Sequence, residues 1–317
     1  MRDCRISWGR LTIAEWDHLF GSIRRSTLLQ HYPYAQSRGR IESRRARHGI
    51  ILIDGERAGL VQVGEIGVLR NAVHVLDVDR GPLWFDGYGS LDDVCAFFRA
   101  FNDEFPNRFG RRRRLLPELS CDAGGVARLQ AAGLVNQATI PGYETVWLDL
   151  KHDLVTLRSK LSAAWRNSLR KSERANVVVS VDSRGETAPL FLAGYEASKA
   201  EKGFNGPSAE FLSTLIAFMA VRREVLILTA RTSEQRLASI LLLLHGQSAT
   251  YQASWTTEQG RRLGCHNRLL WHAITLLRDR GISDLDLGGV NRLHAEGVTK
   301  FKLGMGGEHV QLCGQFA

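Results

Sequence analysis

The run "REVLILTARTSEQRLASILLLLHG" (residues 223–246) decides the fold, because two apolar stretches flank a polar break and predict a pair of neighbouring strands. The segment "SATYQASWT" (248–256) predicts another strand. The next segment, "HNRLLWHAITLLRDRG" (266–281), has apolar residues at helical spacing and a glycine, Gly281, at its end. A strand, "ISDLDLGG" (282–289), completes the set. Antiparallel strands followed by a strand–helix–strand crossover predict an α/β sheet of mixed direction.

A similar order of elements occurs in the first half of the chain. The segment "GIILIDGERAGLVQVGEI" (49–66) predicts a hairpin closed by Asp54-Gly55. A strand, "NAVHVLDVDRGPLW" (71–84), a helix, "LDDVCAFFRAFNDEF" (91–105), and a strand, "RRRRLLPEL" (111–119), follow in turn. The chain therefore contains the same topology twice.

This repetition predicts two tandem α/β domains, each with a mixed sheet flanked by helices. We place the N-terminal domain at residues 1–150 and the C-terminal domain at residues 151–317. We expect a cleft between them and a last strand that packs back on the first domain. The 317-residue length and the 44% share of hydrophobic residues suit two globular cores.

The composition also limits the class of protein. No apolar run approaches the roughly 20 residues that span a bilayer, and the N-terminus lacks the apolar segment of a signal peptide, so we expect a cytoplasmic protein. The five cysteines form no CxxC pair and the histidines show no metal spacing, so we expect no metal site. The net charge of +9 indicates either phosphate-bearing partners or an arginine-rich solvated surface.

Several stretches resemble a known family, the FemABX peptidoglycan-bridge aminoacyltransferases, which are built from tandem GNAT-like domains. The closest similarity lies in "ETVWLDLKHDLVTLRSKLSAAWRNSLRKSERANVVVSV" (144–181), a strand ending in Asp-Leu and then a helix with Trp-Arg-Asn and a basic face. The other matching stretches are "STLLQHYPYAQSRGR" (26–40), "RGPLW" (80–84), "YEASKAEKGFNGPSAEFLSTL" (195–215) and the closing segment "DLGGVN…GVTKFKLGMGGE" (286–308).

The resemblance implies an enzyme that moves an amino acid from aminoacyl-tRNA to an amine acceptor, such as a peptidoglycan precursor or another peptide or metabolite. It implies no cofactor, because aminoacyl-tRNA is itself the donor, and no covalent enzyme intermediate. Contact with an anionic membrane surface would fit the basic charge. The chemistry needs groups that align the amine, remove its proton and stabilise an oxyanion. We find no Ser-His-Asp or Cys-His nucleophile, and it would not be required.

Lys302 is the candidate catalytic residue, because it matches the lysine of the family's Phe-Lys-x-Gly-x-Gly segment, which points toward the reacting ester. Lys300 would face the same way only if this segment were extended. By resemblance, Lys202 and Arg38 match basic positions that contact the acceptor. Further candidates are Tyr251 as a residue lining the substrate site, Gly288 and Gly289 as points of close ligand approach to the backbone, and Arg166, Arg170 and Lys171 as contacts to tRNA.

Two alternatives stay open. One is an acyl-CoA-dependent N-acyltransferase of GNAT fold. Its usual Arg/Gln-x-x-Gly-x-Gly/Ala run corresponds here to "RRLGCH" (261–266), which ends in histidine rather than a small residue. The other is a non-catalytic module that binds RNA or another polyanion. We do not assign a general base, although Glu118, Glu144, Asp286 and Glu308 are candidates.

Overall fold

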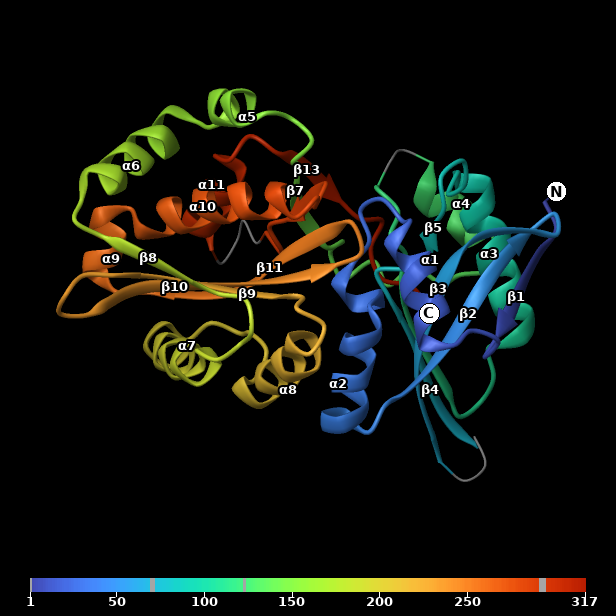
Figure 1. Ribbon diagram of the computed structural model, residues 1–317. Helices are drawn as coiled ribbons and strands as arrows, with labels where there is room; N and C mark the ends of the chain where they lie inside the picture. Colours follow the sequence, from blue (N-terminus) through green and yellow to red (C-terminus); the bar gives the residue numbers. More distant parts are fainter. Residues whose placement is uncertain (1, 69–71, 122–123, 291–294) are drawn as a thin grey trace. The chain divides into compact units, whose positions relative to one another are not determined.

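The computed structural model describes residues 2–68, 72–121, 124–290 and 295–317 (Figure 1). The first residue of the expected strand 71–84 and residues 291–294 of the closing segment therefore lie outside the described residues. The chain divides into two compact units, which we describe separately. Unit 1 comprises Met1–Glu144 with Val310–Ala317, and unit 2 comprises Thr145–His309.

In unit 1 the described residues form a six-stranded sheet with the order β1–β2–β3–β4–β6, in which β5 also pairs with β3. The parallel pair is β4 with β6, and the other neighbours run antiparallel. The strands are β1 (Cys4–Trp8), β2 (Arg45–Ile53), β3 (Glu56–Val68), β4 (Val73–Asp79), β5 (Leu83–Trp84) and β6 (Arg111–Leu116). The helices are α1 (Ile13–Gly21), α2 (Tyr32–Glu42), α3 (Leu91–Glu104) and α4 (Gly125–Ala131), with a 3-10 turn at Leu28–Gln30.

The local sequence explains these elements. The β2–β3 hairpin turns at Asp54 and Gly55, whose φ angles of 51° and 88° are those that a tight two-residue turn requires. Ser90 begins α3 with a capping box, since its side chain accepts from the Asp93 N–H while the Asp93 carboxylate accepts from the Ser90 N–H. The fully buried Phe97 and Phe101 then anchor α3 in the core of unit 1.

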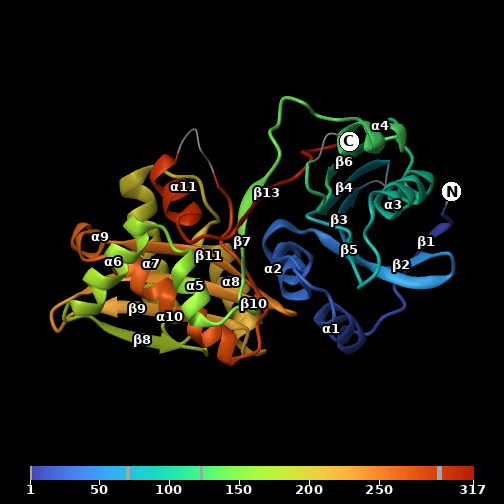
Figure 2. The ribbon, with the colours of Figure 1, turned by 90° about the horizontal axis from the view of Figure 1, so that it is seen from above.

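The C-terminal segment completes unit 1. Leu115 and Phe316 exchange backbone hydrogen bonds of 2.9 and 2.8 Å, so the segment lies beside β6, as Figure 2 also shows. The Phe316 side chain is fully buried in the core that holds Phe97 and Phe101. The last residues of the chain are thus part of the core of its N-terminal unit.

The described residues of unit 2 contribute to a seven-stranded sheet with the order β13–β7–β12–β11–β10–β9–β8. The strands are β7 (Glu144–Asp149), β8 (Val178–Asp182), β9 (Val225–Arg231), β10 (Arg236–His245), β11 (Ser248–Thr256), β12 (Asp284–Asp286) and β13 (Glu308–Gln311). The expected domain boundary at residue 150 lies at the end of β7, whereas the division of the chain lies at its start, because β7 pairs with β12.

Helices cover both faces of this sheet. Figure 1 shows α7 and α8 on one face, and α10 with α6 on the other. The helices are α5 (Leu154–Lys160), α6 (Ala163–Arg174), α7 (Ala188–Lys202), α8 (Ala209–Ala220), α9 (Glu258–Leu263), α10 (Cys265–Asp279) and α11 (Glu296–Leu303). Leu269, Leu270 and Leu277 of α10 are fully buried against the sheet, as their spacing predicted. Two mixed sheets flanked by helices confirm the predicted fold class.

Candidate functional site

The candidate site of unit 2 begins where two neighbouring strands part. β11 and β12 pair in parallel over Ser248–Thr250 and Asp284–Asp286, and β11 continues to Thr256 while β12 ends. The chain leaves β12 through Gly288, whose φ is +72°. A Cβ at Gly288 would lie 3.1 Å from the Tyr251 carbonyl oxygen, so glycine permits both the turn and the close approach to β11.

Lys302 occupies the space beside this turn. Its side chain reaches from α11, is 8% exposed, and donates a hydrogen bond of 2.7 Å from Nζ to the Gly289 carbonyl oxygen. Nζ also lies 5.8 Å from the centre of the Tyr251 ring, and 3.7 Å from where a Cβ on Gly288 would stand. The structure therefore brings together four of the residues selected from the sequence: Lys302, Tyr251, Gly288 and Gly289. We call these residues the Lys302 cluster.

Burial sets the electrostatics of the Lys302 cluster. Loss of water lowers the pKa of Lys302 to about 8, although the negative charge of Asp286 opposes this change. Burial likewise raises the pKa of Tyr251 to about 12, so its hydroxyl stays protonated and donates to Ser254 at 2.5 Å. Lys302 can therefore exchange a proton near neutral pH, whereas Tyr251 supplies an aromatic face and a fixed hydroxyl.

Asp286 supports the turn. Its carboxylate accepts from the Thr145 hydroxyl and, at 2.8 Å, from the Gly288 N–H. Because both partners lie within the β12 turn or on the neighbouring strand, Asp286 fixes the backbone that presents Gly288 and Gly289. Another sequence candidate for the base, Glu118, is bound by Arg80 through contacts of 2.7 and 2.8 Å in unit 1.

An aromatic group holds α11 in place. Phe301, the residue before Lys302, packs 5.8 Å from Trp165 of α6 and 6.2 Å from His266 of α10, measured between ring centres. Burial lowers the pKa of His266 to about 4, and its Nε2 donates to the Trp255 carbonyl oxygen at 3.2 Å. His266 is therefore a neutral packing residue near the start of α10.

Lys300 does not join the cluster. We expected it to face the same way as Lys302 only in an extended segment, and the segment is helical. Lys300 is exposed and pairs with Glu296, one helical turn earlier, at 2.7 Å. Lys300 can therefore serve as a control for Lys302, because both are lysines of α11 but only Lys302 is buried.

Lys202 and the candidate tRNA contacts lie elsewhere in unit 2. Lys202 ends α7, where Nζ donates to Ser198 at 2.7 Å, and burial together with the charge of Arg261 lowers its pKa. Arg166 donates to the carbonyl oxygens of Ser159 and Leu161, so it ties α5 to α6.

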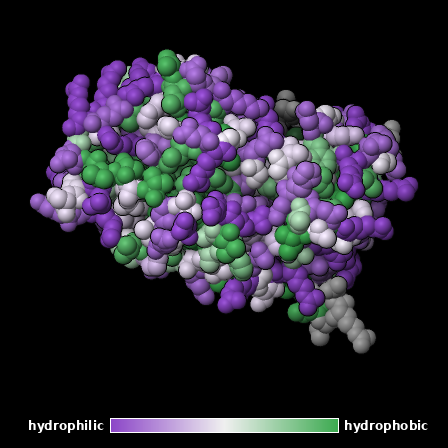
Figure 3. Space-filling view, viewed as in Figure 1, coloured by the Kyte–Doolittle hydropathy of each residue, from purple (hydrophilic) through white to green (hydrophobic). Residues whose placement is uncertain are grey.

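The other two candidate tRNA contacts are exposed on α6. Arg170 donates to Asn167 at 3.4 Å, one turn earlier on the same helix, and Lys171 follows it in the chain. Figure 3 shows a hydrophilic surface over this helix. Arg170 and Lys171 are therefore available to a partner in a way that Arg166 is not.

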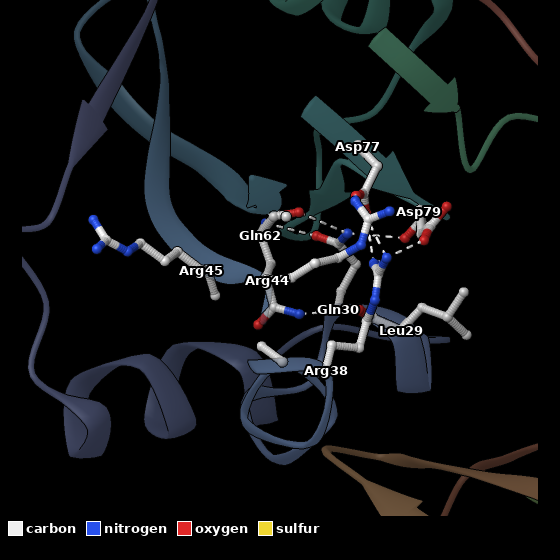
Figure 4. A pocket seen from close by; sticks show the side chains of 11 residues that line it. Leu29, Gln30, Arg38, Arg44, Arg45, Gln62, Asp77 and Asp79 are labelled. Atoms are coloured by element: carbon white, nitrogen blue, oxygen red, sulfur yellow. Dashed lines mark hydrogen bonds and ion pairs between the residues drawn. The ribbon is translucent and has the colours of Figure 1, made fainter. Parts of the chain in front are cut away.

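Arg38 lies in unit 1, in a small pocket beneath α2 (Figure 4). Its Nη1 donates to Asp77 at 2.5 Å and to Asp79 at 3.1 Å, and its Nε donates to Glu42 at 3.0 Å. A phosphate at this arginine would have to displace carboxylates that already neutralise it. These ion pairs were not predicted, although the alternation in "LDVD" places Asp77 and Asp79 on one face of β4.

More arginines reach the same carboxylates. Arg44 binds Asp77, and Arg114 of β6 binds Asp79 at 2.5 Å. Burial and the charge of Asp77 nevertheless raise the pKa of Asp79, against the effect of Arg114. The free space in this pocket is about 10 Å³, less than the roughly 30 Å³ that one water occupies, so its charged groups bind mainly each other.

The described residues contain neither a candidate metal site nor a membrane-spanning helix. Within residues 2–68, 72–121, 124–290 and 295–317, no three histidine, cysteine, aspartate or glutamate side chains are grouped so that they could hold a metal ion. Among the helices of these residues, none has the length and apolar character needed to cross a bilayer.

Comparison with known proteins identifies the fold. Residues 159–311 match the acetyltransferase (GNAT) domain family, which covers most of unit 2. The chain is similar to the crystal structure of FemX, with a TM-score of 0.80 and 15% identity over 98% of this chain and 96% of that one. No curated protein matches the sequence significantly.

Two further solved structures share the architecture. A GNAT-family acetyltransferase from Colwellia psychrerythraea has a TM-score of 0.54 and 13% identity, over 98% of each chain. A tandem GNAT protein from the clavulanic acid biosynthesis pathway has a TM-score of 0.52 and 13% identity, also over 98% of each chain. The chain thus has the tandem GNAT fold of the FemABX kind, as the sequence resemblance predicted.

Proposed function

We propose that the protein is an acyltransferase that moves an amino acid from aminoacyl-tRNA to an amine acceptor. The observation that carries this proposal is the Lys302 cluster. A buried lysine stands beside a glycine turn at the point where β11 and β12 part, and burial lowers its pKa to about 8. The fold shared with FemX over nearly the whole of both chains favours the same chemistry.

The proposed reaction needs no covalent enzyme intermediate. The acceptor nitrogen forms a bond to the ester carbonyl carbon, giving a tetrahedral oxyanion, and the bond to the ribose oxygen then breaks. The amine loses a proton to water, and the departing ribose oxygen gains one. The Lys302 ammonium would stabilise the oxyanion or supply the proton to the ribose oxygen. The glycines at 288 and 289 leave room for the ester beside the backbone.

The proposed partners are inferred from the positively charged side chains of the two units. Arg170 and Lys171 present exposed positive charge on α6, which we assign to phosphates of the tRNA. The acceptor is an amine-bearing molecule such as a peptidoglycan precursor, and an anionic membrane surface is a further proposed contact. Arg38 is bound by Asp77 and Asp79, so contact with an acceptor phosphate would require exchange of those ion pairs.

A second candidate, an acyl-CoA-dependent N-acyltransferase, is favoured by the match of residues 159–311 to a GNAT acetyltransferase domain. Two features of the sequence and structure weigh against it. His266 stands where such enzymes usually have a small residue, and the ring is buried at the start of α10. A Cβ on Gly264 would lie 2.6 Å from the Ser168 carbonyl oxygen, so α6 lies directly against this turn.

Purified protein incubated with charged tRNAs and a pool of amine acceptors tests the proposal, with mass spectrometry to detect a new amide. We expect loss of the aminoacyl ester together with amide formation. Lys302→Ala should abolish turnover, whereas the control Lys300→Ala should retain it, because Lys300 is exposed on the same helix.

The alternatives give different results. Acetyl group transfer from acetyl-CoA, with charged tRNA left intact, would replace the proposal with the second candidate. Salt-sensitive tRNA binding without deacylation in the presence of any acceptor would indicate a non-catalytic binding module instead.

A further inference from the structure

Unit 2 contains a cavity of about 120 Å³ that the Lys302 cluster does not use. It lies between the N-terminal part of α7 and the sheet, and we call it the α7 cavity. Its lining includes Arg231, Arg236, Trp255, Thr229 and Ser180. At roughly 30 Å³ for each water, the cavity holds about four waters. It is therefore large enough for a small polar group, unlike the pocket at Arg38.

The register of the sheet explains how these side chains meet. Ser180 of β8 lies opposite Thr229 of β9, which lies opposite Ser239 of β10, and Ser239 lies opposite Trp255 of β11. Side chains at opposed positions point to the same face of a sheet. The face beneath α7 thus carries a row of three hydroxyl side chains on β8, β9 and β10 that ends at Trp255 on β11, where a helix would ordinarily cover apolar residues.

A basic pair lies beside this row. Arg231 is two residues from Thr229, so it points to the same face, and Arg236 is directly opposite Arg231. Like charges at opposed positions repel each other. Both arginines are exposed, and across the described residues of the chain neither guanidinium has a hydrogen bond or an ion pair. Arg38 and Arg80 of unit 1, by contrast, are bound by carboxylates. The pair therefore presents two positive charges without a counterion from the protein.

Trp255 is part of the same lining and carries an unused donor. It is 8% exposed, and its indole Nε1 is a buried donor without an acceptor in the described structure. Buried donors are nearly always paired in folded proteins. Trp16, Trp84 and Trp165 also have buried indole N–H groups without an acceptor among the described residues, so the Trp255 N–H supports the site through its position beside the two arginines. The indole cannot move away easily, because a Cβ on Gly194 of α7 would already meet the ring at 2.5 Å. The neighbouring Thr229 and Ser239 hydroxyls bond to each other at 2.9 Å, so they do not serve Nε1.

We propose that the α7 cavity binds a phosphate monoester group. Such a group carries about −1.5 to −2 charges at neutral pH, which matches the two guanidinium groups, whereas a carboxylate would leave one of them unneutralised. Guanidinium forks donate to phosphate oxygens in a bidentate manner, and the Trp255 N–H offers another donor to the same anion. Two exposed apolar side chains lie nearby: Leu190 of α7 at the rim of the cavity, and Val178 on the same face of β8. They suit an ester whose remainder is apolar.

Titration of the full-length protein with inorganic phosphate and with glycerol phosphate tests the site, at constant ionic strength against chloride. Two-dimensional NMR of the indole N–H groups reports on Trp255, with Trp255→Phe to assign its signal. We expect the Trp255 N–H signal to move on saturation, as it gains an acceptor. Absence of a saturable phosphate effect in the unmodified protein overturns the proposal.

Arginine variants test whether phosphate binds in the α7 cavity. Arg231→Gln and Arg236→Gln should each weaken phosphate binding by about tenfold or more, since each removes a charge-assisted hydrogen bond, and the double variant should abolish it. Arg280→Gln is the matched control, because it removes one exposed arginine that follows α10 on the other face of the sheet, and it should bind as the unmodified protein does. Equal binding by all four variants would place the phosphate elsewhere and refute the proposal.

Binding to lipid vesicles distinguishes a lipid head group from a soluble phosphate ester as the ligand. Phosphatidylcholine vesicles with phosphatidate should retain the protein in an Arg231-dependent way if the ester is a lipid head group. Vesicles with phosphatidylglycerol, a diester, serve as the control. Binding of glycerol phosphate without vesicle retention assigns a soluble ester, and either result supports the site. Arg231-dependent binding of tRNA alone, without any small phosphate, would overturn it in favour of an RNA surface.

Discussion

Replacing Lys302 with methionine should separate catalysis from stability. A tenfold change in proton affinity corresponds to ~1.4 kcal/mol, so the fall of the Lys302 pKa from 10.5 to about 8 means that burying the charge costs roughly 3 kcal/mol. Methionine fills a similar volume without charge. It loses the hydrogen bond to the Gly289 carbonyl oxygen, which is worth about 1.5–3 kcal/mol for a charged donor. Lys302→Met should therefore be as stable as the unmodified protein at pH 7, or up to about 1.5 kcal/mol more stable, yet inactive.

The stability difference should depend on pH in a defined direction. Below pH 8 Lys302 is charged in both the folded and the unfolded chain, so the full cost is present. Between about pH 8 and 10.5 the folded chain has lost the proton that the unfolded chain retains, so the unmodified protein gains stability as pH rises. Lys302→Met lacks this gain. Denaturant unfolding of both proteins, followed by circular dichroism at pH 7 and pH 10, measures the difference.

Two results would refute this reasoning. A variant destabilised by several kcal/mol equally at both pH values would mean that the Lys302 charge is not disfavoured and that the residue is structural. Full activity in Lys302→Met would remove the lysine from the mechanism. Lys300→Met, which alters an exposed lysine on the same helix, should change neither stability nor activity and serves as the control.

Three further predictions follow from other features. kcat/KM should fall as pH rises through about 8, because the ammonium of Lys302 is the active form, and a pH–rate profile measures this. Gly288→Ala should destabilise unit 2 by ~1–2 kcal/mol and lower kcat, since alanine is strained at a φ of +72° and crowds β11; thermal unfolding and turnover test both effects. Phe316→Ala should cost ~3–5 kcal/mol in unfolding experiments, whereas Phe109→Ala, at a fully exposed phenylalanine, should cost little.

Much of the fold follows from local sequence patterns. Hairpin turns such as Asp54-Gly55 and amphipathic helices such as α3 and α10 depend on residues close together in the chain, so periodicity predicts them. The secondary structure of the closing segment was harder to predict. The two lysines at 300 and 302 flank Phe301, and the spacing alone left both helix and strand open. Packing of Phe301 against Trp165 and His266 accompanies the helix, and those partners lie far away in sequence.

The candidate site was only partly predictable, because some of its contacts join residues far apart in the sequence. The sequence selected Lys302 by family resemblance, Tyr251 by its strand position and the two glycines by the backbone access they allow, and the structure brings these residues together. It could not reveal that Arg38 is neutralised by Asp77 and Asp79, because these pairs join residues from different elements. The α7 cavity was missed because it depends on strand register, which places Arg231 opposite Arg236 only once the strands are paired.

The position of Phe316 has a consequence for the order in which the protein folds during synthesis. Its side chain lies in the core cluster of unit 1 that holds Phe97, in which, among the described residues, Phe316 and Cys313 are the only buried apolar residues made after position 145. A ribosome adds Phe316 only after the whole sequence of unit 2, so the core of unit 1 stays incomplete while unit 2 is being made. The unit that is translated first therefore cannot complete its core until the end of the sequence is made, and until then this core has an open place beside β6 that a chaperone could cover.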